Sequence, residues 1–115
     1  MALRLFNTMG RTLQEFIPIK ENFAGFYGCG PTVYNYAHIG NLRAYVFLDT
    51  LDRTLTFLGF KKKHVMNITD IGHLSGDSDD GEDKMLKTAR ERSMSVLEIA
   101  DFYTDAFFKD IELLN

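Results

Sequence analysis

The chain has 115 residues, of which 45% are hydrophobic and 25% are charged, and its formal net charge at pH 7 is -3. This length suits one small domain with a modest core, and the hydrophobic fraction excludes a disordered segment. The negative charge excludes a general attraction to nucleic acid, so such a contact would need a local basic patch. A single cysteine excludes an internal disulfide, and no stretch is apolar enough for a membrane helix. We therefore expect a globular, cytoplasmic protein.

The N-terminal part of the chain predicts three short strands. Residues 3–6 and 13–17 are apolar segments joined around residues 9–11, and Pro18 closes the second of them. Residues 24–29 form an apolar and aromatic run bounded by glycines, which is typical of a buried strand. A loop from residue 30 to residue 40 follows directly.

A helix and a further strand are expected beyond this loop. Apolar residues recur there at steps of three and four, the spacing of one helical face, at Leu48, Leu51, Leu55 and Leu58. Gly59 follows at the position where helices commonly end on a glycine in the left-handed conformation. The lysine run at residues 61–63 leads into a strand at residues 64–68. The order strand, loop, helix, strand predicts an α/β fold with a parallel βαβ unit and a right-handed crossover.

Two more helices are expected in the C-terminal third. Residues 82–92 are charged and amphipathic, and Ser95 and Glu98 have the spacing of a capping box. The inner face of the last helix would comprise Leu97, Ala100, Tyr103, Phe107, Ile111 and Leu114. Because a parallel sheet of two strands leaves long edges unpaired, we expect residues 1–115 to be the front portion of a larger protein.

The loop after residues 24–29 carries the residues with the richest chemistry. In open parallel sheets, ligands bind at the carboxyl ends of strands, where loops meet helix N-termini. Gly30 and Gly40 would let the backbone approach a ligand closely. N–H groups near Asn41 would point at an anion, and His38 could donate a hydrogen bond to phosphate oxygens. Neither a Walker-type pattern nor a complete G-x-G-x-x-G pattern is present.

Each of these features also has a simpler interpretation. A lone cysteine such as Cys29 is usually a small buried hydrophobe, and a single histidine in such a loop is more often a capping or solvent-facing group. The acidic run at residues 77–83 does not fit a calcium loop, because Glu82 stands where glycine is required, so a solvated loop is expected. The lysine run at residues 61–63 is most simply a solvated strand entrance, with a phosphate contact as the alternative.

Taken in order, the motifs resemble those of the class I aminoacyl-tRNA synthetases. Residues 38–41, His-Ile-Gly-Asn, are a variant of the motif spelled HIGH in that class. The preceding residues 29–34, Cys-Gly-Pro-Thr-Val-Tyr, are similar to the cysteinyl-tRNA synthetase family in particular. Further matches to that family lie at residues 5–8, 15–19, 57–60 and 67–71.

The resemblance implies a fold and an activity. The fold would be the Rossmann-like, nucleotide-binding half of a class I catalytic domain, with residues 1–115 as its N-terminal portion. The activity would be that of a monomeric cysteine–tRNA ligase, which uses ATP with Mg²⁺ to form cysteinyl-adenylate and transfers the cysteine to tRNA(Cys). This length of chain alone is expected to be inactive.

The resemblance also implies roles for single residues. Cys29 matches a zinc ligand whose metal binds the thiolate of the substrate cysteine, and zinc prefers sulfur to the hydroxyl of serine. His38 and Asn41 match catalytic positions that hold the ATP phosphates, together with Gly40. The substrate-binding positions would be Cys29, Gly30, Thr32 and Thr69.

Three departures from the family pattern leave alternatives open. Asn41 replaces the second histidine of the motif but keeps a hydrogen-bond donor, and residues 72–81 look like an insertion near the site. The lysine-rich KMSKS loop, the remaining zinc ligands and the anticodon-binding region would lie beyond Asn115. Two other functions are therefore possible: a cysteine ligase with an amino-sugar acceptor, as in mycothiol synthesis, or a truncated relative that binds a partner or nucleotide without catalysis.

Overall fold

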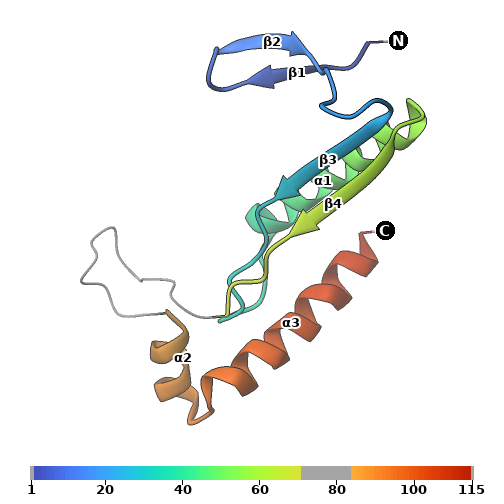
Figure 1. The fold of residues 1–115 in the computed structure, drawn as a ribbon. Coiled ribbons are helices and arrows are strands. Elements are labelled where there is room, and N and C mark those ends of the chain that lie inside the picture. Colours follow the sequence, from blue (N-terminus) through green and yellow to red (C-terminus); the bar gives the residue numbers. More distant parts are fainter. Residues whose placement is uncertain (1, 71–83, 115) are drawn as a thin grey trace.

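The computed structural model of the protein describes residues 2–70 and 84–114, which form a mixed α/β arrangement (Figure 1). The predicted insertion at residues 72–81 and the acidic run at residues 77–83 lie outside the described residues. In chain order the elements are β1 (Arg4–Asn7), β2 (Thr12–Glu15), β3 (Phe23–Gly28), α1 (Ile39–Phe57), β4 (Lys61–Met66), α2 (Lys84–Arg92) and α3 (Val96–Leu113).

The predicted N-terminal strands form an antiparallel hairpin. β1 and β2 pair with Arg4 opposite Glu15 and Asn7 opposite Thr12. Between them, Arg11 adopts a positive φ of 47° in the connecting turn. Figure 1 shows the hairpin projecting beyond the β3–β4 sheet, and Phe16 meets Phe60 edge-on with 5.7 Å between ring centroids. The hairpin is thus tied to the end of the βαβ unit that follows.

The predicted βαβ unit is confirmed. β3 and β4 pair in parallel, from Phe23 opposite Lys61 to Gly28 opposite Met66. Helix α1 packs directly on this pair at Gly28, where a Cβ atom would lie only 2.5 Å from Leu48 Cδ1. β4 begins at Lys61, three residues earlier than predicted, so the lysine run is part of the strand. The described part of the chain contains one parallel pair of strands, β3 and β4.

Helix α1 ends as the sequence predicts. Gly59 has a φ of 84°, and its N–H donates to the carbonyl of Thr56. The N–H of Phe60 donates to the carbonyl of Leu55 at 3.0 Å, which completes the hydrogen-bond pattern of a glycine-terminated helix. Leu55 is buried, whereas the other leucines of the predicted face are half-buried.

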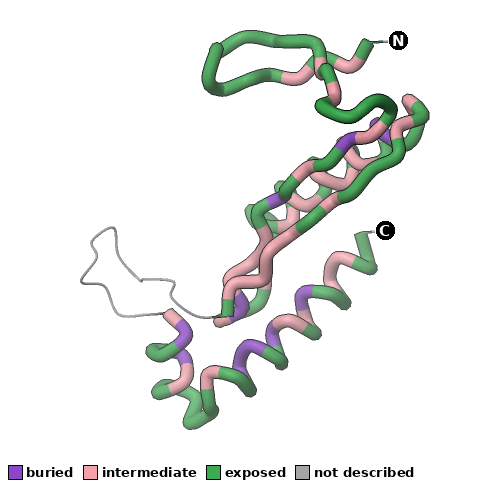
Figure 2. Tube along the Cα trace, in the orientation of Figure 1, coloured by how far each residue is buried: buried purple, intermediate pink, exposed green. Residues whose placement is uncertain are grey.

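The prediction that residues 24–29 form a buried strand is wrong for one face of the sheet. Ala24 and Gly28 are buried, but Gly25 and Tyr27 on the opposite face are exposed. The reason is that α1 covers one face of the two-stranded sheet and no described element covers the other (Figures 1 and 2). An apolar run in a parallel strand indicates burial on both faces only when both faces are covered.

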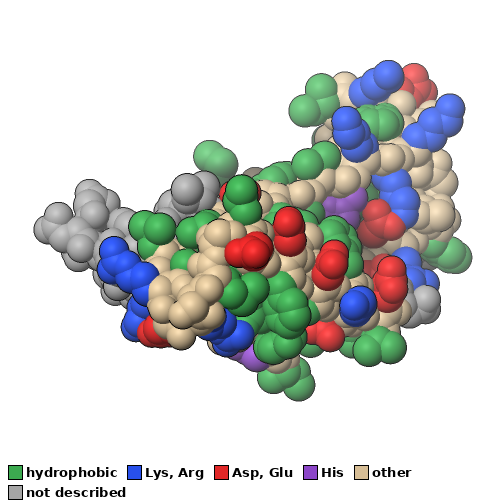
Figure 3. Space-filling view, turned by 90° about the horizontal axis from the view of Figure 1, so that it is seen from below, with side chains coloured by type: hydrophobic (Ala, Val, Ile, Leu, Met, Phe, Trp, Pro, Cys, Tyr) green, Lys and Arg blue, Asp and Glu red, His purple; other side chains and the backbone are tan. Residues whose placement is uncertain are grey.

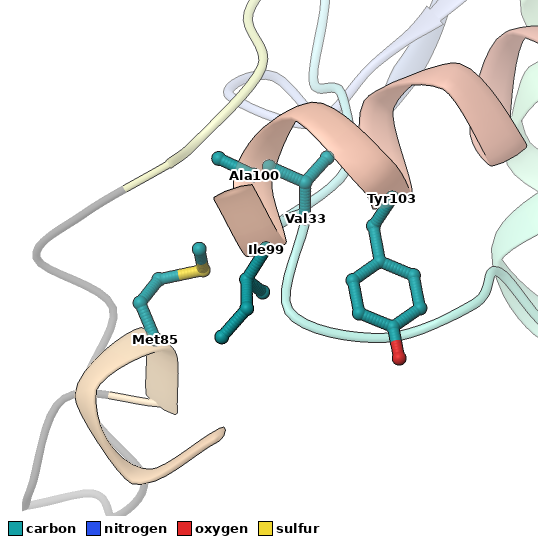
Figure 4. Close-up of a cluster of buried hydrophobic side chains, with 5 residues drawn as sticks. All are labelled: Val33, Met85, Ile99, Ala100 and Tyr103. Carbon is teal, nitrogen blue, oxygen red and sulfur yellow. The ribbon is translucent and has the colours of Figure 1, made fainter. Parts of the chain in front are cut away.

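The two C-terminal helices pack against the loop that follows β3. Their shared cluster of buried side chains comprises Val33, Met85, Ile99, Ala100 and Tyr103 (Figure 4). Ser95 caps α3 as predicted: its Oγ accepts from the Glu98 N–H at 3.2 Å, and the Glu98 carboxylate accepts from the Ser95 N–H at 2.9 Å. This capping box fixes the residue at which α3 begins after α2.

The predicted inner face of α3 is partly wrong. Ala100, Tyr103 and Phe107 are buried, but Leu97 is 70% exposed and Leu114 is 45% exposed. Ile99 takes the place of Leu97, because α2 packs on that side of the first turn and brings Met85 against it. Among the described residues, neither long helix is apolar enough to cross a membrane.

Candidate functional site

The site lies where β3 and β4 end, at the carboxyl edge of the parallel pair. Cys29 follows β3 directly, at the carboxyl end of a strand as predicted, and it is exposed. Its Sγ atom lies 3.9 Å from the carbonyl oxygen of Gly30, a long and weak contact. The thiol is therefore accessible, and the simpler interpretation of a buried hydrophobe does not hold.

Asn67 connects the ends of the two strands. Its Oδ1 accepts hydrogen bonds from the Tyr27 hydroxyl and from the Gly30 N–H, the latter at 2.9 Å. Its Nδ2 donates to Thr69 Oγ1 at 2.9 Å. Sequence reasoning gave this residue no role of its own. The sequence did contain a signal for it: an amide side chain directly follows β4, at the edge where the parallel strand β3 also ends.

The two predicted substrate-binding threonines are neighbours. Thr32 and Thr69 form an isolated parallel bridge beyond the strands. The Val33 N–H donates to the Thr69 carbonyl at 3.0 Å, and the Thr69 N–H donates to the Pro31 carbonyl at 2.9 Å. The bridge brings together residues that lie 37 positions apart, on the same edge as Cys29.

Gly30 is required by backbone packing. A Cβ atom at this position would lie 1.8 Å from the Asn67 carbonyl oxygen and 2.7 Å from Met66 Cγ. The sequence predicted that Gly30 lets the backbone approach a ligand, whereas the close approach seen here is to the chain after β4. This contact fixes the start of the loop relative to Asn67.

His38 and Asn41 cap the N-terminus of α1 together. His38 is the N-cap residue, and its Nδ1 accepts from the Gly40 N–H at 3.1 Å. Asn41 Oδ1 accepts in turn from the His38 N–H at 3.1 Å. An Nδ1 that accepts a hydrogen bond carries no proton, so the neutral ring has its N–H at Nε2. The pair thus keeps Nε2–H and the Asn41 amide hydrogens as donors at the positive end of the helix dipole.

Gly40 makes room for this arrangement. A Cβ atom on Gly40 would lie 3.0 Å from His38 Cε1 and 3.1 Å from Nδ1. These distances are tighter than ordinary contacts, so a side chain at this position would push the imidazole away. The position of His38, within one turn of the helix start, is as the sequence predicts.

A cavity of about 290 Å³ is bordered by some of the predicted site residues, while Cys29, Gly40 and Thr69 are not among its wall residues. Its walls come from the loop at residues 30–38, the first turns of α1, and the helices α2 and α3, and they include Thr32, His38, Asn41, Tyr45, Lys84, Tyr103 and Phe107. Burial raises the pKa of the Tyr45 phenol, and the nearby Cys29 raises it further. Tyr45 is thus a partly buried phenol near Cys29, and it is a second residue that the sequence analysis missed.

A larger cavity lies elsewhere and contains none of the predicted site residues. It measures about 440 Å³ and is formed by α1, β4 and the end of α3, with Tyr45 as the one wall residue shared with the smaller cavity. Its lining is mainly apolar, and His64 with an unpartnered Nε2 belongs to it. The smaller cavity is the better candidate for chemistry, since it gathers the polar groups of the loop and the helix start.

The described residues supply one thiol for a metal and no complete site. No group of three or more His, Cys, Asp or Glu side chains lies together within residues 2–70 and 84–114. The exposed side chain of Cys29 has the right chemistry for a zinc ligand, because zinc binds thiolate well. A protein zinc site needs further donors, and this part of the chain does not provide them.

Comparison with known proteins identifies the family of this chain. The family model for the class I (C) catalytic domain of tRNA synthetases matches residues 15–115. The chain is 67% identical over its whole length to a protein of Treponema denticola named cysteine–tRNA ligase, and covers 23% of that protein. Proteins of the same name from Novosphingobium aromaticivorans and Treponema pallidum are 57% and 55% identical, over 98% and 100% of the chain. The chain spans less than a quarter of the length of these relatives, 22–23%. It belongs to the class I (C) tRNA synthetase catalytic domain family.

Proposed function

We propose that this chain is the N-terminal part of the catalytic domain of a cysteine–tRNA ligase. The observation that carries the proposal is the 67% identity, over all 115 residues, to a protein named cysteine–tRNA ligase. The βαβ unit would then be part of a Rossmann-like fold that binds the nucleotide. The reaction joins cysteine to ATP as cysteinyl-adenylate, releases pyrophosphate, and passes the cysteine to the 3′ end of tRNA(Cys).

His38 and Asn41 would bind the phosphates of ATP, which enters with Mg²⁺. The reciprocal cap fixes both side chains before the substrate arrives, because His38 Nδ1 and Asn41 Oδ1 are each held by a backbone N–H. The Nε2–H and the amide hydrogens then face charge that develops on phosphate oxygens as the adenylate forms. Such preorganised donors stabilise a transition state without the cost of reorienting them.

Cys29 would be one ligand of a zinc ion at the carboxyl end of β3. Zinc binds thiolate far better than hydroxyl, so the bound ion supplies discrimination between cysteine and serine that shape alone cannot give. The exposure of Cys29 supports this role. The pKa of the Tyr45 phenol is raised by burial and by the charge of Cys29, which indicates that the two side chains lie near each other.

Gly30, Thr32 and Thr69 would line the amino-acid pocket. Thr32 and Thr69 are held side by side by their backbone bridge, and Asn67 fixes Thr69 through its Oγ1. The Thr69 hydroxyl is therefore positioned by a contact at the sheet edge, and the backbone bridge places Thr32 next to it. This arrangement supports a role in orienting the substrate, while the metal selects its side chain.

Charging of tRNA with labelled cysteine tests this proposal, including the identity of the acceptor. The complete reading frame that contains this chain is incubated with ATP, labelled cysteine and either tRNA(Cys) or an amino sugar. We expect label on the tRNA alone, since the relatives reported above are named cysteine–tRNA ligases. Label on the amino sugar alone, or on neither acceptor, would contradict the proposal.

A further inference from the structure

A second polar cavity borders the first, on the side of α2. It measures about 280 Å³, and it shares Tyr34, Asn35 and Lys84 with the cavity that contains His38 and Asn41. The two cavities therefore lie next to each other along these three residues.

The second cavity is basic in a chain that is acidic as a whole. Among the residues that the structure describes, its charged lining consists of Lys84, Lys87 and Arg92 and one carboxylate, that of Glu91. Within residues 2–70 and 84–114, none of the three cations has a carboxylate within ion-pair distance. Figure 3 views this end of the molecule and shows Lys and Arg side chains gathered at its surface. The cavity is thus a local basic patch of the kind that an acidic protein needs for binding a polyanion.

Two of these cations are held in place by aromatic rings. Lys84 Nζ lies 5.4 Å from the centroid of the Tyr34 ring, and Arg92 Cζ lies 5.3 Å from that of Tyr103. Contacts of this kind restrict a long side chain without neutralising its charge. Lys87 lies one turn after Lys84 on the same helix and is exposed. The positive charges are therefore partly preorganised while remaining free to meet an anion.

We propose that this cavity binds a phosphate group of the substrates, and the proposal rests on the proposed function. These lysine and arginine side chains have no carboxylate partner within residues 2–70 and 84–114, and such cations suit phosphate oxygens, which accept charge-assisted hydrogen bonds. The phosphate has two possible sources: the triphosphate of ATP, or the phosphodiester backbone near the 3′ end of the tRNA. Both bring the same chemistry to Lys84, Lys87 and Arg92.

Charge changes at Lys87 test the proposal in the complete reading frame. The variants are Lys87→Ala and Lys87→Glu, and the matched control is Lys109→Glu, the same charge change on the exposed side of α3. Binding of ATP is measured by calorimetry. Binding of an RNA hairpin with the acceptor-stem sequence and a single-stranded 3′ end is measured by fluorescence anisotropy at several salt concentrations. Neither measurement needs catalysis.

We expect Lys87→Ala to lower the affinity for one of the two ligands by roughly threefold, and Lys87→Glu to lower the same affinity further. If the phosphate belongs to RNA, the slope of log K against log salt concentration also becomes less negative by about 0.7, because one phosphate contact is lost. Weaker ATP binding alone assigns the cavity to the triphosphate, and weaker RNA binding alone assigns it to the tRNA. Variants at Lys87 that behave like Lys109→Glu toward both ligands would overturn the proposal. Failure of the wild-type protein to charge tRNA would instead count against the proposed function.

Discussion

Replacing Gly30 by alanine should open the junction between the site loop and the chain after β4. The added Cβ would lie 1.8 Å from the backbone oxygen of Asn67, and real Cβ contacts do not fall below 3.0 Å. The two segments must therefore separate by about 1.2 Å, and the obstacle is backbone that no rotamer change can move. This separation breaks the hydrogen bond from the Gly30 N–H to Asn67 Oδ1 and strains the bridge between Thr32 and Thr69.

The expected cost of Gly30→Ala is about 3 kcal/mol, from overpacking and one or two lost hydrogen bonds. Gly25→Ala is the matched control, because its Cβ would meet only Phe23 Cε1, at an ordinary 3.6 Å. We expect Gly25→Ala to change stability by less than about 1 kcal/mol. The free energies of unfolding come from urea denaturation of the complete protein. Equal stability of the two variants would refute the reasoning.

Three further substitutions separate structural from chemical roles. Asn67→Ala should destabilise the protein by about 2 kcal/mol in urea denaturation, because the Gly30 N–H loses its acceptor; an unchanged urea midpoint would contradict this role. His38→Asn should keep the helix cap and the stability, since asparagine is a good N-cap, yet reduce cysteine-dependent exchange of pyrophosphate with ATP roughly 100-fold or more. Retained exchange would show that His38 is a cap alone. Hydrogen bonds from Ser95 lower the pKa of Glu98, so this contribution to stability is present above the usual glutamate pKa and is lost as pH falls through the lowered value. Ser95→Ala should therefore return the Glu98 pKa toward its usual value in an NMR titration, and an unmoved pKa would count against the capping box.

The elements that could be predicted are those set by local signals. Gly59 ends α1 and Ser95 starts α3 because each residue satisfies backbone groups within a few positions of itself. The hairpin and the parallel βαβ unit likewise follow from strand patterns and the residues between them. The positions of Cys29 at a strand end and His38 at a helix start are of the same kind.

The features that were missed depend on contacts between distant parts of the chain. Leu97 and Ile99 are equally apolar, and only the packing of α2 decides that Ile99 is buried. The role of Asn67 depends on Tyr27 and Gly30, which lie 40 and 37 residues away. The basic cavity arises because α2 packs against the loop after β3, and no spacing of residues in the sequence predicts such a contact.

We propose that this site activates cysteine, and amino-acid-dependent exchange of pyrophosphate with ATP measures that step directly. The complete reading frame is assayed with cysteine and with serine, beside the 115-residue chain under the same conditions. We expect exchange with cysteine and none with serine in the complete protein. Absence of exchange with cysteine, or equal exchange with serine, would contradict it.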